Sequence, residues 1–157
     1  MSSRSVRSAA KRKSRRKPSR VAFGQLDRHL GYFLRRLQLW VFQDFIATLR
    51  PMKVRPAQYS VLLLIEANPG RSQAAIGAAL GIERARLARM LHELERRNWV
   101  ARADGSDARS HSLHLTADGE RALIKIRRLA ERHEAKLAKH VGVKRRRQLL
   151  DWLRQLG

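Results

Sequence analysis

Apolar residues recur at helical spacing through most of the chain. Over residues 23–49 they fall at i, i+3 and i+4 for six turns, which predicts one long amphipathic helix built on Leu26, Leu30, Phe33, Leu34, Leu37, Val41 and Phe45. Pro56 suits the first position of a second helix, over about 56–67. Its apolar run, Val61–Ile65, would also fit a buried strand, but the length and the following Asn68-Pro69-Gly70 favour a helix.

Two shorter helices are predicted next. Ser72 is placed to cap a helix that ends at Leu80, with Gly81 just beyond its end. The helix over about 83–97 turns Leu87, Met90, Leu91 and Leu94 inward. Its outer face carries Arg84, Ala85, Arg86, Ala88, Arg89, Glu93 and Arg96.

Alternation with period two then predicts a β-hairpin. The strands are 99–102 and 111–115, and the polar stretch 104–110 forms the tip. Thr116 is placed to cap a long helix that Gly142 ends, and a last helix is expected over about 144–156. The predicted fold class is therefore mainly α with a small β-hairpin.

Charge changes this picture, because the 157 residues hold 35 Lys+Arg against 13 Asp+Glu, a net charge of +22. Nine of the basic residues and none of the acids lie in residues 1–20, which predicts a disordered basic arm. The arm either adds phosphate contacts or is a solvated tail. Residues 21–157 keep 26 basic and 13 acidic residues, so the folded part is basic as well. Nucleic acid is the favoured partner, ahead of an anionic membrane surface.

Composition also excludes several classes of protein. The chain has no Cys, which rules out disulfides, zinc fingers and Cys nucleophiles. No apolar run is long enough to span a bilayer, so a cytoplasmic protein is expected. Of the six His residues, His133 and His140 could share a helix face with Glu134 nearby, but zinc usually needs three or four converging ligands, so structural or exposed His residues are favoured. No catalytic triad or phosphate-binding loop is evident. We therefore expect no cofactor, no metal and no enzymatic activity.

The order helix, turn, cationic helix and hairpin over residues 72–115 is that of a winged helix-turn-helix. A helix fits the DNA major groove, and the planar fork of Arg meets O6 and N7 of guanine together. The alternative for the helix arginines is an ordinary solvated face. The candidate DNA-binding residues are Ser72, Gln73, Arg84, Arg86, Arg89, Asp107, Arg109 and Ser110.

Three motifs carry a resemblance: Ser72-Gln73…Leu80-Gly81-Ile82, Leu87…Leu91…Leu94-Glu95, and Asp107-Ala108-Arg109…Leu113…Leu115-Thr116…Gly119. Together they resemble the MarR family of bacterial transcriptional regulators. The resemblance implies a winged helix-turn-helix over 51–116 and long dimerisation helices in 21–50 and 117–157. It also implies a homodimeric repressor that binds an inverted-repeat operator in double-stranded DNA. Ala85 and Ala88 stand where the family often has Ser or Thr, so contacts should depend more on the arginines.

The resemblance further implies release of DNA by a small, often aromatic, anion bound between the dimerisation helices and the winged domain. The candidate ligand-binding residues are His29, Tyr32, Arg36 and Tyr59. The high positive charge would also suit a coenzyme A thioester. Two other functions stay open: a non-specific architectural nucleic-acid-binding protein, and a basic protein that binds RNA. Net charge alone does not separate them from a specific regulator.

Overall fold

The computed structural model describes residues 21–104 and 111–156, which form helices and one two-stranded sheet. The long elements are α1 (Leu30–Leu49), α2 (Pro56–Ala67), α3 (Gln73–Leu80), α4 (Arg84–Arg96), α5 (Ala117–Val141) and α6 (Val143–Leu156). The strands β1 (Val100–Asp104) and β2 (His111–Leu115) pair antiparallel, with Val100 opposite Leu115. The predicted fold class is confirmed, and the run Val61–Ile65 is helical.

The predicted helix over 23–49 is wrong in its first turns. The chain there forms a short 3-10 helix, η1 (Gly24–Arg28), and α1 begins only after His29, whose backbone is extended with φ −96° and ψ 110°. Every side chain from Val21 to Leu30 is exposed, so no burial in this chain holds η1 in line with α1. The apolar spacing continued through the break, and the periodicity alone could not show it.

The core lies around α2, and most elements contribute to it. Val61, Leu62 and Ile65 of α2 are completely buried. They pack with buried side chains from the neighbouring elements: Leu49, Ile76, Leu87, Leu91, Leu94, Val100, Leu113, Leu123 and Ile126. Burying a side chain of this size contributes about 1.5–3 kcal/mol to the free energy of unfolding, so this cluster is the main source of stability for α2, α3, α4 and the hairpin.

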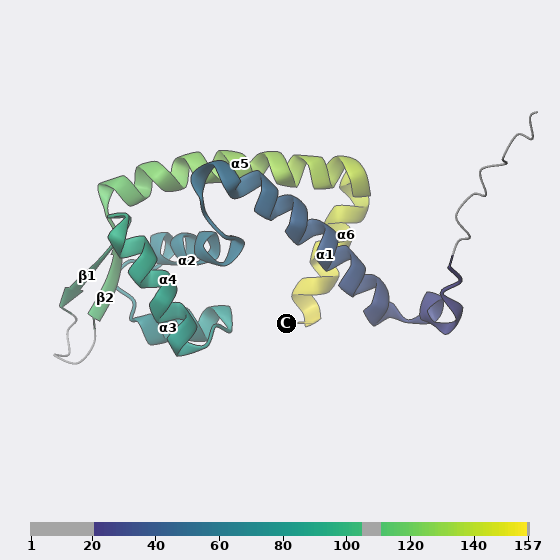
Figure 1. The fold of residues 1–157 in the computed structure, drawn as a ribbon, viewed down its shortest axis with the longest axis horizontal. Coiled ribbons are helices and arrows are strands. Elements are labelled where there is room, and N and C mark those ends of the chain that lie inside the picture. The colour runs from purple at the N-terminus through teal and green to yellow at the C-terminus, as the bar shows by residue number, and fades with distance from the viewer. Residues whose placement is uncertain (1–20, 105–110, 157) are drawn as a thin grey trace, which may run out of the picture.

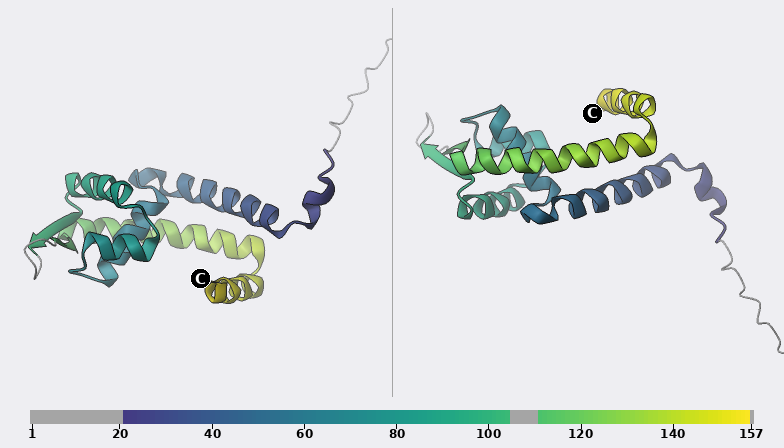
Figure 2. Two further views of the ribbon diagram at one scale, coloured as in Figure 1. Left: turned by 90° about the horizontal axis from the view of Figure 1, so that it is seen from below. Right: turned by 90° about the horizontal axis from the view of Figure 1, so that it is seen from above.

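The head formed by α2, α3, α4 and the hairpin occupies one end of the molecule (Figure 1). Helix α5 runs from the hairpin along the whole length, α1 lies beside it, and α6 folds back at the other end (Figures 1 and 2). Helix α2 lies between α5 and α3, so α5 and the α3–α4 pair face opposite sides of the molecule.

A tight turn joins α3 to α4. Gly81 adopts the left-handed conformation with φ +60°, which a residue with a side chain rarely adopts, and so ends α3. The Ser72 hydroxyl accepts a hydrogen bond from the Ala75 N–H at 3.3 Å, which confirms the predicted cap. At the start of α4, the Glu83 carboxylate accepts one from the Ala85 N–H at 3.1 Å.

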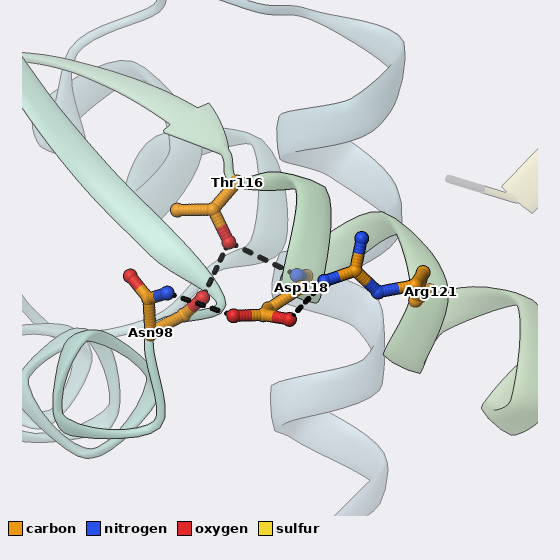
Figure 3. A network of polar contacts seen from close by, with 5 residues as sticks. Asn98, Thr116, Asp118 and Arg121 are labelled. Atoms are coloured by element: carbon orange, nitrogen blue, oxygen red, sulfur yellow. Dashed lines mark hydrogen bonds and ion pairs between the residues drawn. The ribbon is translucent and has the colours of Figure 1, made fainter.

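A second joint fixes the base of the hairpin to the start of α5 (Figure 3). The Thr116 hydroxyl donates to the Asn98 carbonyl and accepts from the Gly119 N–H at 3.0 Å, which confirms Thr116 as the cap of α5. Asp118 accepts from the Asn98 amide at 2.8 Å and pairs with Arg121. These two contacts, first with Asn98 and then with Arg121, hold the pKa of the exposed Asp118 carboxylate below its ordinary value.

Gly119 is the closest-packed point of this joint. A Cβ at position 119 would overlap the backbone carbonyl of Trp99, which cannot move without pulling β1 away from α4. We expect Gly119→Ala to lower the free energy of unfolding by about 2–3 kcal/mol, the cost of overpacking a site that cannot relax. Urea unfolding at fixed protein concentration measures it. Gly31→Ala, whose Cβ meets nothing within 4 Å, is the matched control. An equal loss in both variants would contradict this account.

Candidate nucleic-acid interface and adjoining cavity

Helix α4 separates an apolar face from a cationic one. Leu87, Leu91 and Leu94 are completely or almost completely buried, while Arg84, Arg86 and Arg89 are exposed. Because the buried face is held against the core, the arginines are directed to solvent. The expected outward direction of these three residues is confirmed.

The start of α3 lies beside the hairpin. Ser72 forms an isolated antiparallel bridge with Ser112 of β2, and the Ser72 hydroxyl is engaged in the cap of α3. The Gln73 amide lies 3.5 Å from the Arg84 carbonyl, a long contact that brings the side chain to the start of α4. These two candidates therefore gather near the cationic helix. The other three, Asp107, Arg109 and Ser110, lie outside the described residues.

A buried polar link ties α4 to the start of α2. The Gln58 side chain is only 2% exposed, and its Nε2 donates to Glu93 Oε2 at 2.7 Å. Its Oε1 accepts from the Arg55 N–H at 3.0 Å, so both ends of the amide are satisfied. Sequence reasoning missed this pair. The available signal was a polar residue inside the apolar pattern of α2, three residues after Arg55.

Two further contacts hold α4 to the elements around it. Arg102 on β1 forms an ion pair with Glu95 at 2.5 Å. Arg97, just beyond α4, donates to the Lys53 carbonyl at 2.8 Å and lies over the Trp99 ring at 4.9 Å. With the Gln58–Glu93 link, these contacts fix the orientation of the cationic helix on the head.

A cavity of about 530 Å³ lies between α1, the start of α2 and α4. Its apolar lining residues include Phe42 and Ile46 of α1 and Met90 of α4. The remaining lining residues are Arg55, Pro56, Ala57, Arg86, Arg89 and Glu93. Its volume is in the range of small-molecule sites, and its cationic side favours an anionic ligand. Arg86 and Arg89 thus belong both to this cavity and to the outer face of α4.

The four candidate ligand residues do not gather within one chain. Tyr32 and Arg36 lie toward the start of α1, where the Arg36 guanidinium is 5.7 Å from the Tyr32 ring centre. His29 immediately precedes α1. Tyr59 lies on α2, with its ring edge-to-face on Phe45 at 5.9 Å, and burial raises the pKa of its hydroxyl. None of the four lines the cavity beside α4.

An apolar hollow of about 250 Å³ lies between α1, α5 and α6 at the end away from the head. Leu37, Val41, Leu137 and Leu150 are among its lining residues. On α6, which supplies part of the lining, Trp152 is 65% exposed and Leu156 is 83% exposed, although both are large apolar side chains. Clustered exposed apolar surface of this kind marks a protein–protein interface.

A polar cluster, here called the Asp44 clamp, joins α1 to α5. His133 is 5% exposed, its ring stacks on Phe45 at 4.8 Å, and its Nδ1 lies 2.8 Å from Asp44 Oδ2. The Lys136 ammonium donates to the other oxygen of Asp44. The Lys136 hydrogen bond and then the His133 contact hold the pKa of Asp44 below its ordinary value.

Within residues 21–104 and 111–156, no three His, Asp or Glu side chains converge on a common point that could hold a metal ion. Over the same residues, no helix combines the length and the apolar character needed to cross a bilayer.

Comparisons with known proteins agree on one family. The model of the MarR family matches residues 53–110. A relative from Thauera aromatica, described as a transcriptional regulatory protein for the hcr operon, is 30% identical over 152 residues, or 92% of each chain. Among solved structures, the transcriptional repressor CouR bound to a 23-mer DNA duplex is 44% identical, with a TM-score of 0.85 over 88% of this chain and 99% of that one. CouR bound to p-coumaroyl-CoA is 41% identical, with a TM-score of 0.79 over 87% and 96% of the two chains.

The Gln58–Glu93 link yields a test of how α4 is held. We expect Gln58→Leu to lower the free energy of unfolding by about 1–3 kcal/mol, because it removes the donor to Glu93 and the acceptor for the Arg55 N–H in a buried place. Glu93→Gln keeps an oxygen that can accept from Gln58 and is the matched control. Thermal and urea unfolding of both variants measure the difference. If Glu93→Gln were as damaging as Gln58→Leu, the charge of Glu93 rather than the hydrogen bond would hold α4.

The Asp44 clamp predicts a pH dependence. A carboxylate with a lowered pKa in the folded chain stabilises the fold above its unfolded pKa, and that contribution disappears as the pH falls through the folded value. Asp44→Asn should therefore be less stable than the wild type at pH 7, and the gap should close below about pH 4. Asp151→Asn, which removes an exposed ion pair with Arg154 at 3.4 Å, is the control and should change stability little at any pH. A gap for Asp44→Asn that persists unchanged at pH 3 would disprove the assignment.

Proposed function

This chain belongs to the MarR family of transcriptional regulators, and from that premise we propose that it is a repressor that binds an inverted-repeat operator as a homodimer and leaves it when an aromatic acyl-coenzyme A thioester binds. The observation that carries the proposal is the position of Arg86 and Arg89. They lie on the exposed face of α4 and also line the cavity behind it. The role is one of binding rather than catalysis, and it places the protein on the nucleoid in the cytoplasm.

We assign dimerisation to residues 21–50 and 117–157. The exposed apolar side chains of α1 and α6, together with the apolar hollow between them, supply a surface that a second copy can cover. The same patch on both subunits makes a two-fold interface. Such a dimer presents two α4 helices, which suits half-sites one helical turn, about 34 Å, apart.

We assign DNA recognition to residues 51–116. The exposed Arg84, Arg86 and Arg89 would enter the major groove on α4, and Ser72 and Gln73 would lie near the phosphates at the start of α3. Asp107, Arg109 and Ser110 remain proposed contacts of the hairpin tip. A repressor of the same family, CouR, has been solved on a DNA duplex, which supports this division of roles.

The cavity beside α4 has two chemical sides that match the two parts of an acyl-coenzyme A. Phe42, Ile46 and Met90 offer an apolar wall for an acyl or aromatic group. Arg55, Arg86 and Arg89 offer guanidinium groups for phosphates, which Arg binds with its planar fork. The structure of CouR with p-coumaroyl-CoA supports this ligand class. His29, Tyr32, Arg36 and Tyr59 stay proposed contacts for the ligand.

Because two arginines would serve both partners, ligand and DNA would compete for them. A bound thioester would neutralise Arg86 and Arg89 and place its own phosphates beside the DNA backbone. The resulting like-charge juxtaposition would oppose DNA binding without requiring α4 to move.

Three kinds of arginine variant test this arrangement. We expect Arg86→Ala and Arg89→Ala each to weaken operator binding by about 1–3 kcal/mol and also to reduce the thermal shift produced by p-coumaroyl-CoA. Arg84→Ala, on the same helix but outside the cavity, should weaken operator binding and keep the thermal shift. Arg55→Ala should keep operator binding and reduce the thermal shift. Mobility shift with an inverted-repeat duplex and differential scanning fluorimetry give the two measurements.

Two outcomes would contradict the proposal. If scrambled DNA competed equally with the operator at physiological salt, the chain would be a non-specific architectural protein instead of a specific regulator. If Arg86→Ala and Arg89→Ala kept the full thermal shift, the cavity beside α4 would not be the ligand site.

A further inference from the structure

The positive charge of this chain is concentrated away from the DNA-reading head. Residues 51–116 hold ten Lys+Arg and six Asp+Glu, a net of +4. Residues 117–157 hold twelve Lys+Arg and five Asp+Glu, a net charge of +7. The two C-terminal helices therefore carry more than half of the net charge of +13 that residues 21–157 have. The function proposed above gives these helices a dimerisation role, which does not call for cations.

Part of this excess forms a line along α5, here called the α5 stripe: Lys125, Arg128, Arg132 and Lys139. All four side chains are exposed, and none makes an ion pair within the part of the chain that the structure describes. The other cations of α5 that the structure describes are engaged, since Arg121, Arg127 and Lys136 pair with Asp118, Glu66 and Asp44.

The α5 stripe faces outward from the molecule. The buried side chains of α5 include Leu123, Ile126, Ala130 and His133, and the 100° rotation per residue places the stripe roughly opposite to them. Since α5 packs on α1 and α2, and α2 lies between α5 and α3, the stripe is turned away from the side of the α3–α4 pair (Figure 1). A duplex held by α4 would therefore not cover it.

We propose that the α5 stripe binds the phosphate backbone of a second DNA duplex, so that one regulator dimer bridges two DNA segments. Lys125 and Lys139 are 14 residues apart, about 21 Å along the helix axis. B-DNA carries about one charge per 1.7 Å, so about twelve phosphate charges lie within that length. Contacts from Lys and Arg to phosphates position a duplex without reading its sequence, so this second site is expected to be indifferent to sequence.

DNA is the favoured occupant because the first site of the same molecule holds DNA. A second segment of the same chromosome is then present at a high effective concentration, which raises the occupancy of a weak site. The exposed large apolar side chains are gathered on α1 and α6, and Ile124 is the one such side chain of α5 within the described residues. The stripe thus lacks the apolar centre that a protein partner would require.

A two-duplex capture experiment tests the proposal. An immobilised operator duplex is saturated with the full chain, unbound protein is washed away, and a fluorescent duplex without an operator is added. The wild type should retain the second duplex. Lys125→Gln combined with Arg128→Gln and Arg132→Gln should reduce this retention at least tenfold, since each lost phosphate contact lowers the slope of log K against log salt by about 0.9. Operator affinity, measured on the same support, should change less than twofold.

The matched control removes three charges elsewhere on the same scaffold, by Lys144→Gln, Arg145→Gln and Arg147→Gln on α6, whose side chains are also exposed. It should retain the second duplex. Loss of capture in both triple variants would assign the effect to net charge and overturn the stripe as a site. Failure of the wild type to capture a second duplex while it still binds the operator would overturn the proposal and leave the first function intact. If poly-glutamate were captured as well as the duplex at equal charge, the stripe would be a site for acidic proteins instead.

Discussion

The burial of one face of α4 in the core of the head is the constraint on which the remaining architecture depends. Leu87, Leu91 and Leu94 are buried together with Val61 and Leu62, and this leaves α4 only one orientation in which its cations reach solvent. Removing any of these leucines would open a cavity as well as lose burial. The apolar face of α4 therefore determines which side is cationic, and the polar links from Gln58 and Arg97 complete the fixing of its orientation.

The same constraint creates the cavity. Because its buried face fixes the direction of α4, Arg86 and Arg89 line a cavity that Phe42 and Ile46 of α1 line as well. These two apolar side chains are 48% and 49% exposed, an unfavourable state that a ligand with an apolar part would relieve. A regulator built in this way can couple DNA binding to ligand binding through shared side chains, and no separate moving element is required.

Sequence patterns within a few residues predict most of the helices and strands, but they do not predict contacts between side chains that are far apart in the sequence. Helix ends are predictable at Ser72, Gly81 and Thr116, because each acts through contacts within a few residues of the sequence. The break at His29 has no side-chain cap, so the sequence does not indicate it in this way. The Gln58–Glu93 pair spans 35 residues and the Asp44–His133 pair spans 89, and neither spacing belongs to one element. Residue type along the first two helical segments predicts the candidate ligand residues, whereas residues of α1, α4 and the start of α2 line the cavity together.

Net charge does not follow the division of roles that we propose. The head from 51 to 116 carries only +4, because Glu83, Glu93 and Glu95 offset its arginines while they cap α4 or fix its position. Specific recognition needs a few cations in fixed directions, and acids nearby help to fix them. Within the described residues, the cations of the α5 stripe have no such acidic neighbours in an ion pair, which suits them to a DNA backbone that is uniform along its length. In the roles that we propose, a specific site and a non-specific site coexist in one small chain.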